Sequence, residues 1–127
     1  MTMRTPLSRV LHYGSAHEGT SHFWRQRVTG AANAILIVGF VLILFSTMRL
    51  PHAEAVAVLR SPLVAAVLAL MIVSAVVHMR IGMQVIVEDY IHGEALKVIL
   101  LVANTFFAFA VGAVGLIAIA RLLLGGA

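Results

Sequence analysis

The sequence predicts an all-α integral membrane protein, with three transmembrane helices in an antiparallel bundle and a polar N-terminal tail. Composition is the first observation: 61% of the 127 residues are hydrophobic, 11% are charged, and the mean hydropathy is +1.04. A soluble domain of this size leaves too much of its chain exposed to hide that apolar surface. Lipid must therefore be the main solvent of this protein. Length is the second observation: three apolar runs, at residues 28–48, 62–87 and 98–124, can each cross about 30 Å of hydrocarbon.

A polar, basic tail occupies residues 1–27, ahead of the first run. Small and hydroxylated residues predict a loop-like tail rather than a long regular helix. These residues are Gly14, Ser15, Gly19, Thr20 and Ser21. The basic part is longer than that of a secretory signal, so we expect the tail to be retained. Residues 1–127 then form a single membrane domain.

The connections between the runs, residues 49–61 and 88–97, are short. Short connections place consecutive helices side by side and antiparallel. No transit segment rich in Arg and Ser and poor in acidic residues is evident. This favours a bacterial inner (cytoplasmic) membrane over a mitochondrial inner membrane.

Arginines on either side of the runs bear on orientation in the membrane. An excess before the first run favours a cytoplasmic N-terminus, because cytoplasmic segments are enriched in Lys and Arg. The arginines in question are Arg4, Arg9, Arg25 and Arg27. Three others, on the opposite side, oppose that orientation: Arg49, Arg60 and Arg121.

Charge and cysteine content exclude several function classes. The net charge of +4 is scattered along the chain rather than gathered on a soluble face, so we expect no nucleic-acid binding. The chain has no cysteine, which excludes disulfides, thiolate catalysis and Cys-ligated iron–sulfur clusters within it. Any iron–sulfur chemistry would belong to a partner.

The second run carries a histidine at membrane depth. His78 lies about 18 Å along a helix from Tyr90, hence near mid-bilayer if Tyr90 is at the inner surface. Ionisable groups at that depth usually face a bundle interior, where a neutral imidazole can bind haem iron. Gly82, about 40° round the helix, would leave space on the same face for a flat macrocycle. No second histidine lies at this depth, so a six-coordinate haem would take its other ligand from another chain.

Other interpretations of His78 and Gly82 stay open. A buried histidine also serves as a hydrogen-bonding contact to a neighbouring helix or as a proton relay. Gly82 would then only permit close helix packing. The spacing by itself does not separate haem ligation from these roles.

Asp89 and Tyr90 are adjacent at the membrane border. On a helix, Asp89 lies about 20° from the face of His78, whereas Tyr90 is rotated by about 120°. A proton-exchanging carboxylate beside a phenol that can hydrogen-bond a carbonyl oxygen suits a quinone headgroup. The residues alone favour the alternative, in which Asp89 caps a helix end and Tyr90 belongs to an aromatic belt.

Two arginines are placed differently from the rest. Arg27 could reach an anionic group at the bilayer boundary, such as a haem propionate, although an anchor with Trp24 as its interfacial aromatic is the simpler interpretation. Arg80 is about 160° from His78 and either pairs with another helix or extends towards the interface. We assign no catalytic role to Arg80. Four further residues are predicted to serve helix packing: Asn33, Asn104, Gly112 and Gly115.

These residues together resemble a known family. The pattern of His78, Gly82, Gln84, Val85 and Asp89-Tyr90 resembles the small hydrophobic membrane anchor of succinate dehydrogenase (respiratory complex II). The tail resembles the alphaproteobacterial and mitochondrial type of this anchor at Gly14-Ser15, Gly19, His22-Phe23-Trp24, Gln26-Arg27 and Thr29. The resemblance covers the tail and the first two runs, and the third run is similar only in being apolar.

The resemblance implies a three-helix membrane-anchor domain that pairs with a second three-helix membrane anchor, beneath a flavoprotein subunit and an iron–sulfur subunit. His78 would be one axial ligand of the iron of haem b, and the second anchor would supply the other. Tyr90 would hydrogen-bond ubiquinone, and Asp89 would support that site or its protonation. Arg27 would lie near the haem propionates or the quinone pocket. FAD and the iron–sulfur clusters would belong to the partners, and this chain alone would catalyse nothing.

Three rival functions follow from the same residues. The anchor of a quinol:fumarate reductase runs the same chemistry in the opposite direction. A structural or assembly membrane protein would use His78, Asp89 and Tyr90 only for packing and at the boundary. A proton-coupled transporter would require more paired acidic residues within the spans, whereas Glu88 and Asp89 lie at a border.

Overall fold

The computed structural model describes residues 19–125, and these residues are almost entirely helical. The helices are α2 (Gly19–Thr47), α3 (His52–Leu59), α4 (Pro62–Tyr90) and α5 (Glu94–Leu123). α2, α4 and α5 are each long and apolar enough to cross a membrane. No strand occurs in the part of the chain that the structure describes. The predicted all-α membrane class with three spans is therefore confirmed. Arg4 and Arg9 lie outside the described residues.

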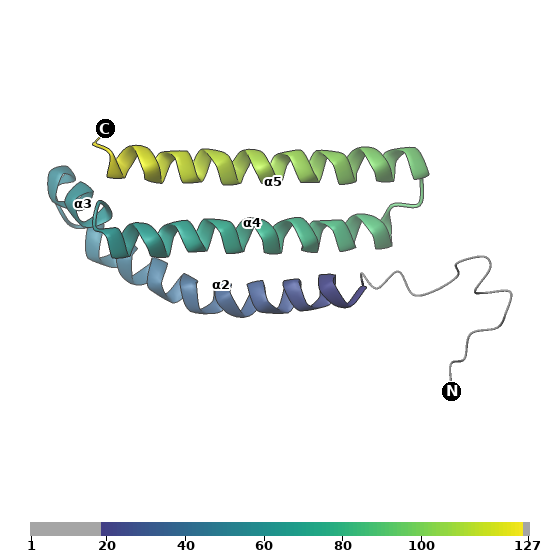
Figure 1. Cartoon of the computed structure of the whole chain (residues 1–127), viewed down its shortest axis with the longest axis horizontal. Helices are drawn as coiled ribbons and strands as arrows, with labels where there is room; N and C mark the ends of the chain where they lie inside the picture. The colour runs from purple at the N-terminus through teal and green to yellow at the C-terminus, as the bar shows by residue number, and fades with distance from the viewer. Residues whose placement is uncertain (1–18, 126–127) are drawn as a thin grey trace, which may run out of the picture.

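α4 is the middle of the three long helices. Figure 1 shows α2 and α5 running along opposite sides of α4, with the short helix α3 beside the turn from α2 to α4. The short connections make each neighbour antiparallel to α4, as predicted. Because α2 and α5 cover two sides of α4, its other two sides remain open to lipid or to partner chains.

The helix bounds correct three expectations from the sequence. α2 begins at Gly19, so residues 19–27 of the predicted loop-like tail are helical. Tertiary packing favours helix in this segment, because the Gln26 side chain lies against Gly82 of α4 and local propensity is only a weak preference. The connection at residues 49–61 contains α3, which follows Pro51. α4 continues for three residues past the predicted end at 87 and stops at Tyr90.

The ends of α4 follow from local backbone chemistry. Pro62 occupies the first turn, where its missing N–H leaves no hydrogen bond unmade, and Ser61 precedes it in an extended conformation. At the other end Ile91 is also extended, with φ of −98° and ψ of 115°, which stops the helix after Tyr90. A side chain ties the opposite end of the protein together, since Arg60 Nε donates to the Leu122 carbonyl oxygen at 3.0 Å.

Very little of the chain is buried within itself. Within the described residues the buried apolar side chains are few and mostly small: Ala65, Ile81, Val87 and Ala108. Large apolar residues project from all three long helices, including Phe106, which is 71% exposed. Such a surface is stable only where lipid or other membrane subunits cover it.

α4 and α5 approach each other through glycines. A Cβ atom on Gly115 would lie 3.0 Å from Cδ1 and 3.2 Å from Cγ2 of Ile72. A Cβ atom on Gly112 would lie 3.7 Å from Val76, which is ordinary van der Waals contact. Asn104 Nδ2 donates to the Arg80 carbonyl oxygen at 2.9 Å across the same interface. The predicted packing roles of Gly112, Gly115 and Asn104 are confirmed.

The two glycines give a matched test of this interface. We expect Gly115→Ala to lower the free energy of unfolding by about 1–3 kcal/mol, because the new methyl group overpacks against Ile72. Gly112→Ala should be neutral or slightly stabilising, since its methyl group has room and Ala is the better helix former. Equilibrium unfolding in mixed micelles, followed by circular dichroism, measures both changes. An equal loss in the two variants would contradict the close approach at Gly115.

Candidate functional site on helix α4

His78 lies on the side of α4 that faces α2, and its ring is half-buried. Its Nδ1 atom is 3.2 Å from the carbonyl oxygen of Gln26 and 3.2 Å from Oγ1 of Thr29. Both partners lie on α2, about 50 residues earlier in the chain. α2 therefore orients the His78 ring of α4.

The partners of His78 determine which ring nitrogen carries the proton. A backbone carbonyl can only accept, so the contact with Gln26 requires a hydrogen on Nδ1. The Thr29 hydroxyl donates to the Arg25 carbonyl oxygen at 2.7 Å, which leaves the Thr29 oxygen free to accept from Nδ1. In the neutral ring the lone pair is then on Nε2, which has no hydrogen-bond partner among residues 19–125.

This arrangement is compatible with a metal-binding histidine. Ligand histidines usually donate their second ring N–H to a carbonyl or carboxylate, which fixes the tautomer and the ring orientation. Here that donor is Nδ1, and Nε2 is the nitrogen that could reach iron. The described residues contain no group of three or more His, Asp or Glu side chains that could hold a metal ion. His78 by itself can offer one nitrogen ligand, through Nε2.

Glycines set the spacing between α2 and α4 at this level. A Cβ atom on Gly30 would lie 3.3 Å from Cε1 and 3.7 Å from Nδ1 of His78, so the absence of a side chain there admits the ring. A Cβ atom on Gly82 would lie 3.3 Å from Nε2 of Gln26. In this structure Gly82 accordingly serves the contact between α2 and α4, which is the packing role that the sequence left open.

Two amide oxygens near His78 are buried without a hydrogen-bond partner in the described chain, namely Oε1 of Gln26 and Oδ1 of Asn33. They lie two turns apart on α2, on either side of the turn that holds Thr29 and Gly30. Asn33 also borders a cavity of about 420 Å³ between α2 and α4, lined by Gly30, Asn33, Ala34, Ile37, Met71 and Ala75. Buried acceptors of this kind are usually satisfied, so this side of the interface is suited to a further donor group or water.

Asp89 and Tyr90 form the last turn of α4. Both side chains are exposed, Tyr90 by 75%, and neither makes a side-chain hydrogen bond to another described residue. Tyr90 is about 18 Å along the helix axis from His78. The structure therefore separates the predicted site residues of α4 into two levels, one at His78 and one at the helix end.

Arg27 is not a free cation in this structure. Its guanidinium carbon lies 4.2 Å from the centroid of the Phe23 ring, a cation–π contact within α2. Phe23 in turn meets Trp24 edge to face, with ring centroids 6.0 Å apart. Arg27 is exposed and lies one turn before Gly30, so it is near the level of His78.

The sequence missed the residues that orient His78. Gln26 falls within residues 19–27, which were predicted to be irregular, so no helical face could be assigned to it. Thr29 and Gly30 fall within the predicted first run, but the sequence does not say which face of that run meets His78. Continuing the helix back through the tail would have placed Gln26, Thr29 and Gly30 on one side, since residues three and four apart are neighbours on a helix. The cation–π contact of Arg27 was missed for the same reason.

Comparison with known proteins identifies the family. The family model described as "Succinate dehydrogenase/Fumarate reductase transmembrane subunit" matches residues 1–117. The chain belongs to this family. It is similar to the succinate dehydrogenase hydrophobic membrane anchor subunit of Paracoccus denitrificans, with 31% identity over 121 residues that cover 95% of this chain and 93% of the relative. The corresponding subunit of Rickettsia bellii is 27% identical over 108 residues, covering 83% and 84% of the two chains. No solved structure matches.

Family membership and the three spans agree with the resemblance in the sequence. The chain is a multi-pass membrane protein and a membrane anchor subunit of the succinate dehydrogenase/fumarate reductase type. An anchor subunit of this type associates with catalytic subunits and with the membrane. The exposed apolar side chains of α2, α4 and α5 provide the surface for contact with lipid.

The tautomer of His78 can be measured directly. In the full-length chain without cofactor, in lipid bilayers, we expect the neutral ring to be protonated on Nδ1, because both partners of Nδ1 are acceptors. Nitrogen-15 NMR of labelled histidine distinguishes the two ring nitrogens, and loss of the signal in His78→Gln assigns it. His52, which is exposed on α3 and makes no side-chain hydrogen bond with another described residue, is the internal control and should show no fixed preference. Protonation of His78 on Nε2 would contradict the geometry.

Proposed function

We propose that this chain is the membrane anchor of a succinate:ubiquinone oxidoreductase, where it helps to bind haem b and to form the ubiquinone-reduction site. The observation that supports the haem role most directly is the His78 ring, whose Nδ1 is engaged by two acceptors while Nε2 carries the lone pair. The name shared by the relatives from Paracoccus denitrificans and Rickettsia bellii supports the succinate dehydrogenase assignment.

In this proposal His78 holds haem b through Nε2, and a second membrane anchor supplies the other axial ligand. Arg27 lies near the same level and would bind a propionate by leaving its contact with Phe23. When bound, haem b supplies a one-electron redox centre between the two anchors. Gln26 and Thr29 fix the ring of His78, so the energetic cost of orienting the ligand is met by the fold.

The quinone role rests on the exposed end of α4. The Tyr90 phenol would donate a hydrogen bond to a carbonyl oxygen of ubiquinone, and the Asp89 carboxylate would accept and pass on protons. Reduction of a quinone to a quinol consumes two electrons and two protons. The electrons would come from succinate through FAD in the flavoprotein subunit and clusters in the iron–sulfur subunit, whereas Asp89 and Tyr90 act on the quinone and its protons.

The same proposal places the complex in a bacterial inner membrane with the N-terminus of this chain cytoplasmic. Arg25 and Arg27 stand at the start of α2 and support this orientation, since cytoplasmic ends of spans are enriched in arginine. The end of α4 with Asp89 and Tyr90 lies at the same end of the molecule as the start of α2, so it would also face the cytoplasm (Figure 1).

Two alternative functions keep specific support. The family description covers fumarate reductase as well as succinate dehydrogenase, and the residues of this chain do not set the direction of the reaction. A cofactor-free structural role is supported by the packing of His78 against Gly30 and of Gly82 against Gln26. Absorbance of haem in the assembled complex separates that structural role from the proposed one.

The haem role is tested by replacing His78 in the complex co-expressed with its partner subunits. The wild type should show a reducible haem b spectrum, and His78→Ala should lose it, because the axial nitrogen is gone. His52→Ala, on the exposed surface of α3, is the control and should keep the spectrum. Partial recovery of the spectrum in His78→Ala on addition of imidazole would separate lost ligation from misfolding. A normal spectrum in His78→Ala without imidazole would refute ligation by this chain.

The quinone role is tested with Tyr90→Phe, which removes only the hydroxyl. We expect kcat/KM for ubiquinone to fall roughly 2- to 10-fold, the equivalent of one hydrogen bond of about 0.5–1.5 kcal/mol. Succinate oxidation with a soluble dye that bypasses the quinone should be unchanged, which controls for assembly. Normal ubiquinone kinetics in Tyr90→Phe would eliminate the proposed hydrogen bond.

A further inference from the structure

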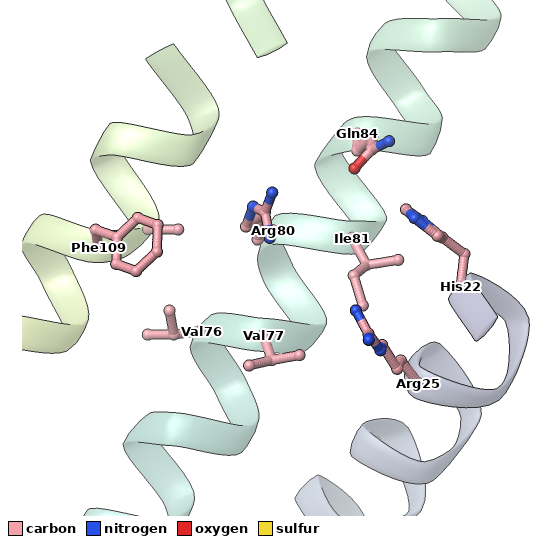
Figure 2. Close-up of a pocket in the computed structure, with 9 residues that line it drawn as sticks. His22, Arg25, Val76, Val77, Arg80, Ile81, Gln84 and Phe109 are labelled. Carbon is pink, nitrogen blue, oxygen red and sulfur yellow. The ribbon is translucent and has the colours of Figure 1, made fainter. Parts of the chain in front are cut away.

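Two cavities border both α4 and α5 in the half of α4 that ends at Tyr90. The larger, of about 530 Å³, also reaches α2 and is partly polar, and Figure 2 shows Arg25 and Arg80 at its border. The smaller, the α4–α5 groove, has a volume of about 340 Å³ and shares no lining residue with the larger cavity. Its apolar lining consists of Met79, Met83, Val87, Leu100, Ala103 and Phe107.

The α4–α5 groove lies in line with Tyr90 on α4. Val87, Met83 and Met79 precede Tyr90 by three, seven and eleven residues, which places all three within about 60° of Tyr90 round the helix. His78 is about 120° from Tyr90, so the groove lies on a different side of α4 from the proposed haem ligand. Because Val87 is about one turn from Tyr90, the groove begins directly below the end of α4 that carries the phenol.

The length of the groove matches one leaflet of a bilayer. Met79 is eleven residues before Tyr90, which is about 17 Å along the helix axis. Half of the hydrocarbon thickness of a bilayer is about 15 Å. With Tyr90 at the membrane border, as the quinone role requires, the groove runs down through the hydrocarbon and ends near the middle of the bilayer.

The lining of the groove suits an uncharged apolar chain. None of the described residues that line it is charged, so the lining offers no cation for a phosphate. Asn104 is the polar member of the lining, and its Nδ2 already donates to the Arg80 carbonyl oxygen at 2.9 Å. Met79 and Met83 have flexible side chains, which adapt to irregular apolar groups. Met83 is 43% exposed and Phe107 is 58% exposed, so this chain leaves the groove open at its surface.

We propose that the α4–α5 groove holds the isoprenoid chain of ubiquinone while the headgroup contacts Tyr90. This proposal rests on the quinone role proposed for Tyr90. Ubiquinone carries its isoprenoid chain on the same ring as its two carbonyl groups, so a headgroup at Tyr90 must send the chain into hydrocarbon nearby. The groove is an apolar surface that starts one turn below that position. Since lipid also gives the chain apolar surroundings, the main effect of the groove is to orient the headgroup at Tyr90.

Filling the groove tests this proposal with quinones that differ only in the isoprenoid chain. Ala103 lines the groove and is exposed, so Ala103→Phe fills it without overpacking a buried core. In the complete complex in lipid nanodiscs, we expect KM for long-chain ubiquinone to rise about fivefold with kcat unchanged. KM for a ubiquinone analogue without the chain should stay the same. Ala113→Phe is the matched control, because Ala113 is exposed on α5 and does not line the groove.

The two quinones separate failure of this proposal from failure of the quinone role. An unchanged KM for long-chain ubiquinone in Ala103→Phe, or an equal rise for both quinones, would overturn the groove as the place of the chain. The analogue without the chain depends only on the headgroup contacts. Slower reduction of this analogue in Tyr90→Phe would uphold the headgroup contact even where Ala103→Phe has no effect.

Photo-crosslinking of the wild-type complex keeps the proposal testable if Ala103→Phe assembles poorly. The probe is a ubiquinone analogue with a diazirine in its isoprenoid chain, and mass spectrometry identifies the labelled peptides. We expect label on the groove residues of α4 and α5, and excess unmodified ubiquinone should remove it. Label confined to α2 or to a partner subunit would contradict the proposal. A phosphatidylcholine with a diazirine in its acyl chain is the comparison, and groove labelling by this lipid that ubiquinone does not displace would assign the groove to lipid instead.

Discussion

His78 meets α2 through Nδ1, which lies 3.2 Å from both the Gln26 carbonyl oxygen and the Thr29 hydroxyl. This contact has two effects. It fixes how α2 approaches α4, and it fixes which nitrogen of the His78 ring carries the proton. Gly30 is required for the same approach, since a side chain there would meet the ring. A neutral histidine deep in a membrane is costly unless its polar atoms are engaged, and α2 engages only one of them. The other ring nitrogen, Nε2, has no hydrogen-bond partner among residues 19–125 and stays available to a group outside them.

The same dependence appears in the packing. α4 touches α2 on one side and α5 on the other, and the described residues bury few apolar side chains between them. The flat arrangement in Figure 1 contrasts with a closed bundle, in which a third contact between α2 and α5 would hide the inner faces. Since lipid tails are as apolar as these side chains, the helices gain little from hiding them from lipid. Open sides of α4 are thus a stable state in a membrane and leave room for other subunits.

Hydropathy was sufficient to predict the three spans, because each long helix must satisfy its own backbone in lipid and shows this as an unbroken apolar run. The start of α2 at Gly19 could not be predicted in this way, since Gly19, Thr20 and Ser21 indicate a loop locally, yet they begin a helix whose Gln26 packs against Gly82 of α4. The depth of His78 followed from counting along a helix. Its partners did not, because they depend on which face of α2 meets α4. Those faces are a property of tertiary packing.

Arg80 shows why charge at membrane depth needs more than sequence spacing to interpret. No role could be assigned to Arg80 from the sequence. The residues of α2 and α5 that lie near Arg80 are known only from the packing of the helices. His78 and Arg80 differ by two positions, so a helix must direct them to opposite sides. A group that binds at one cannot also compensate the other. The short segment His78-Met79-Arg80 therefore divides between two surroundings: His78 contacts Gln26 and Thr29 of α2, whereas Arg80 lines a cavity that residues of α2 and α5 also border. Two ionisable side chains so close in sequence thus meet different neighbours, because the helix turns them about 160° apart.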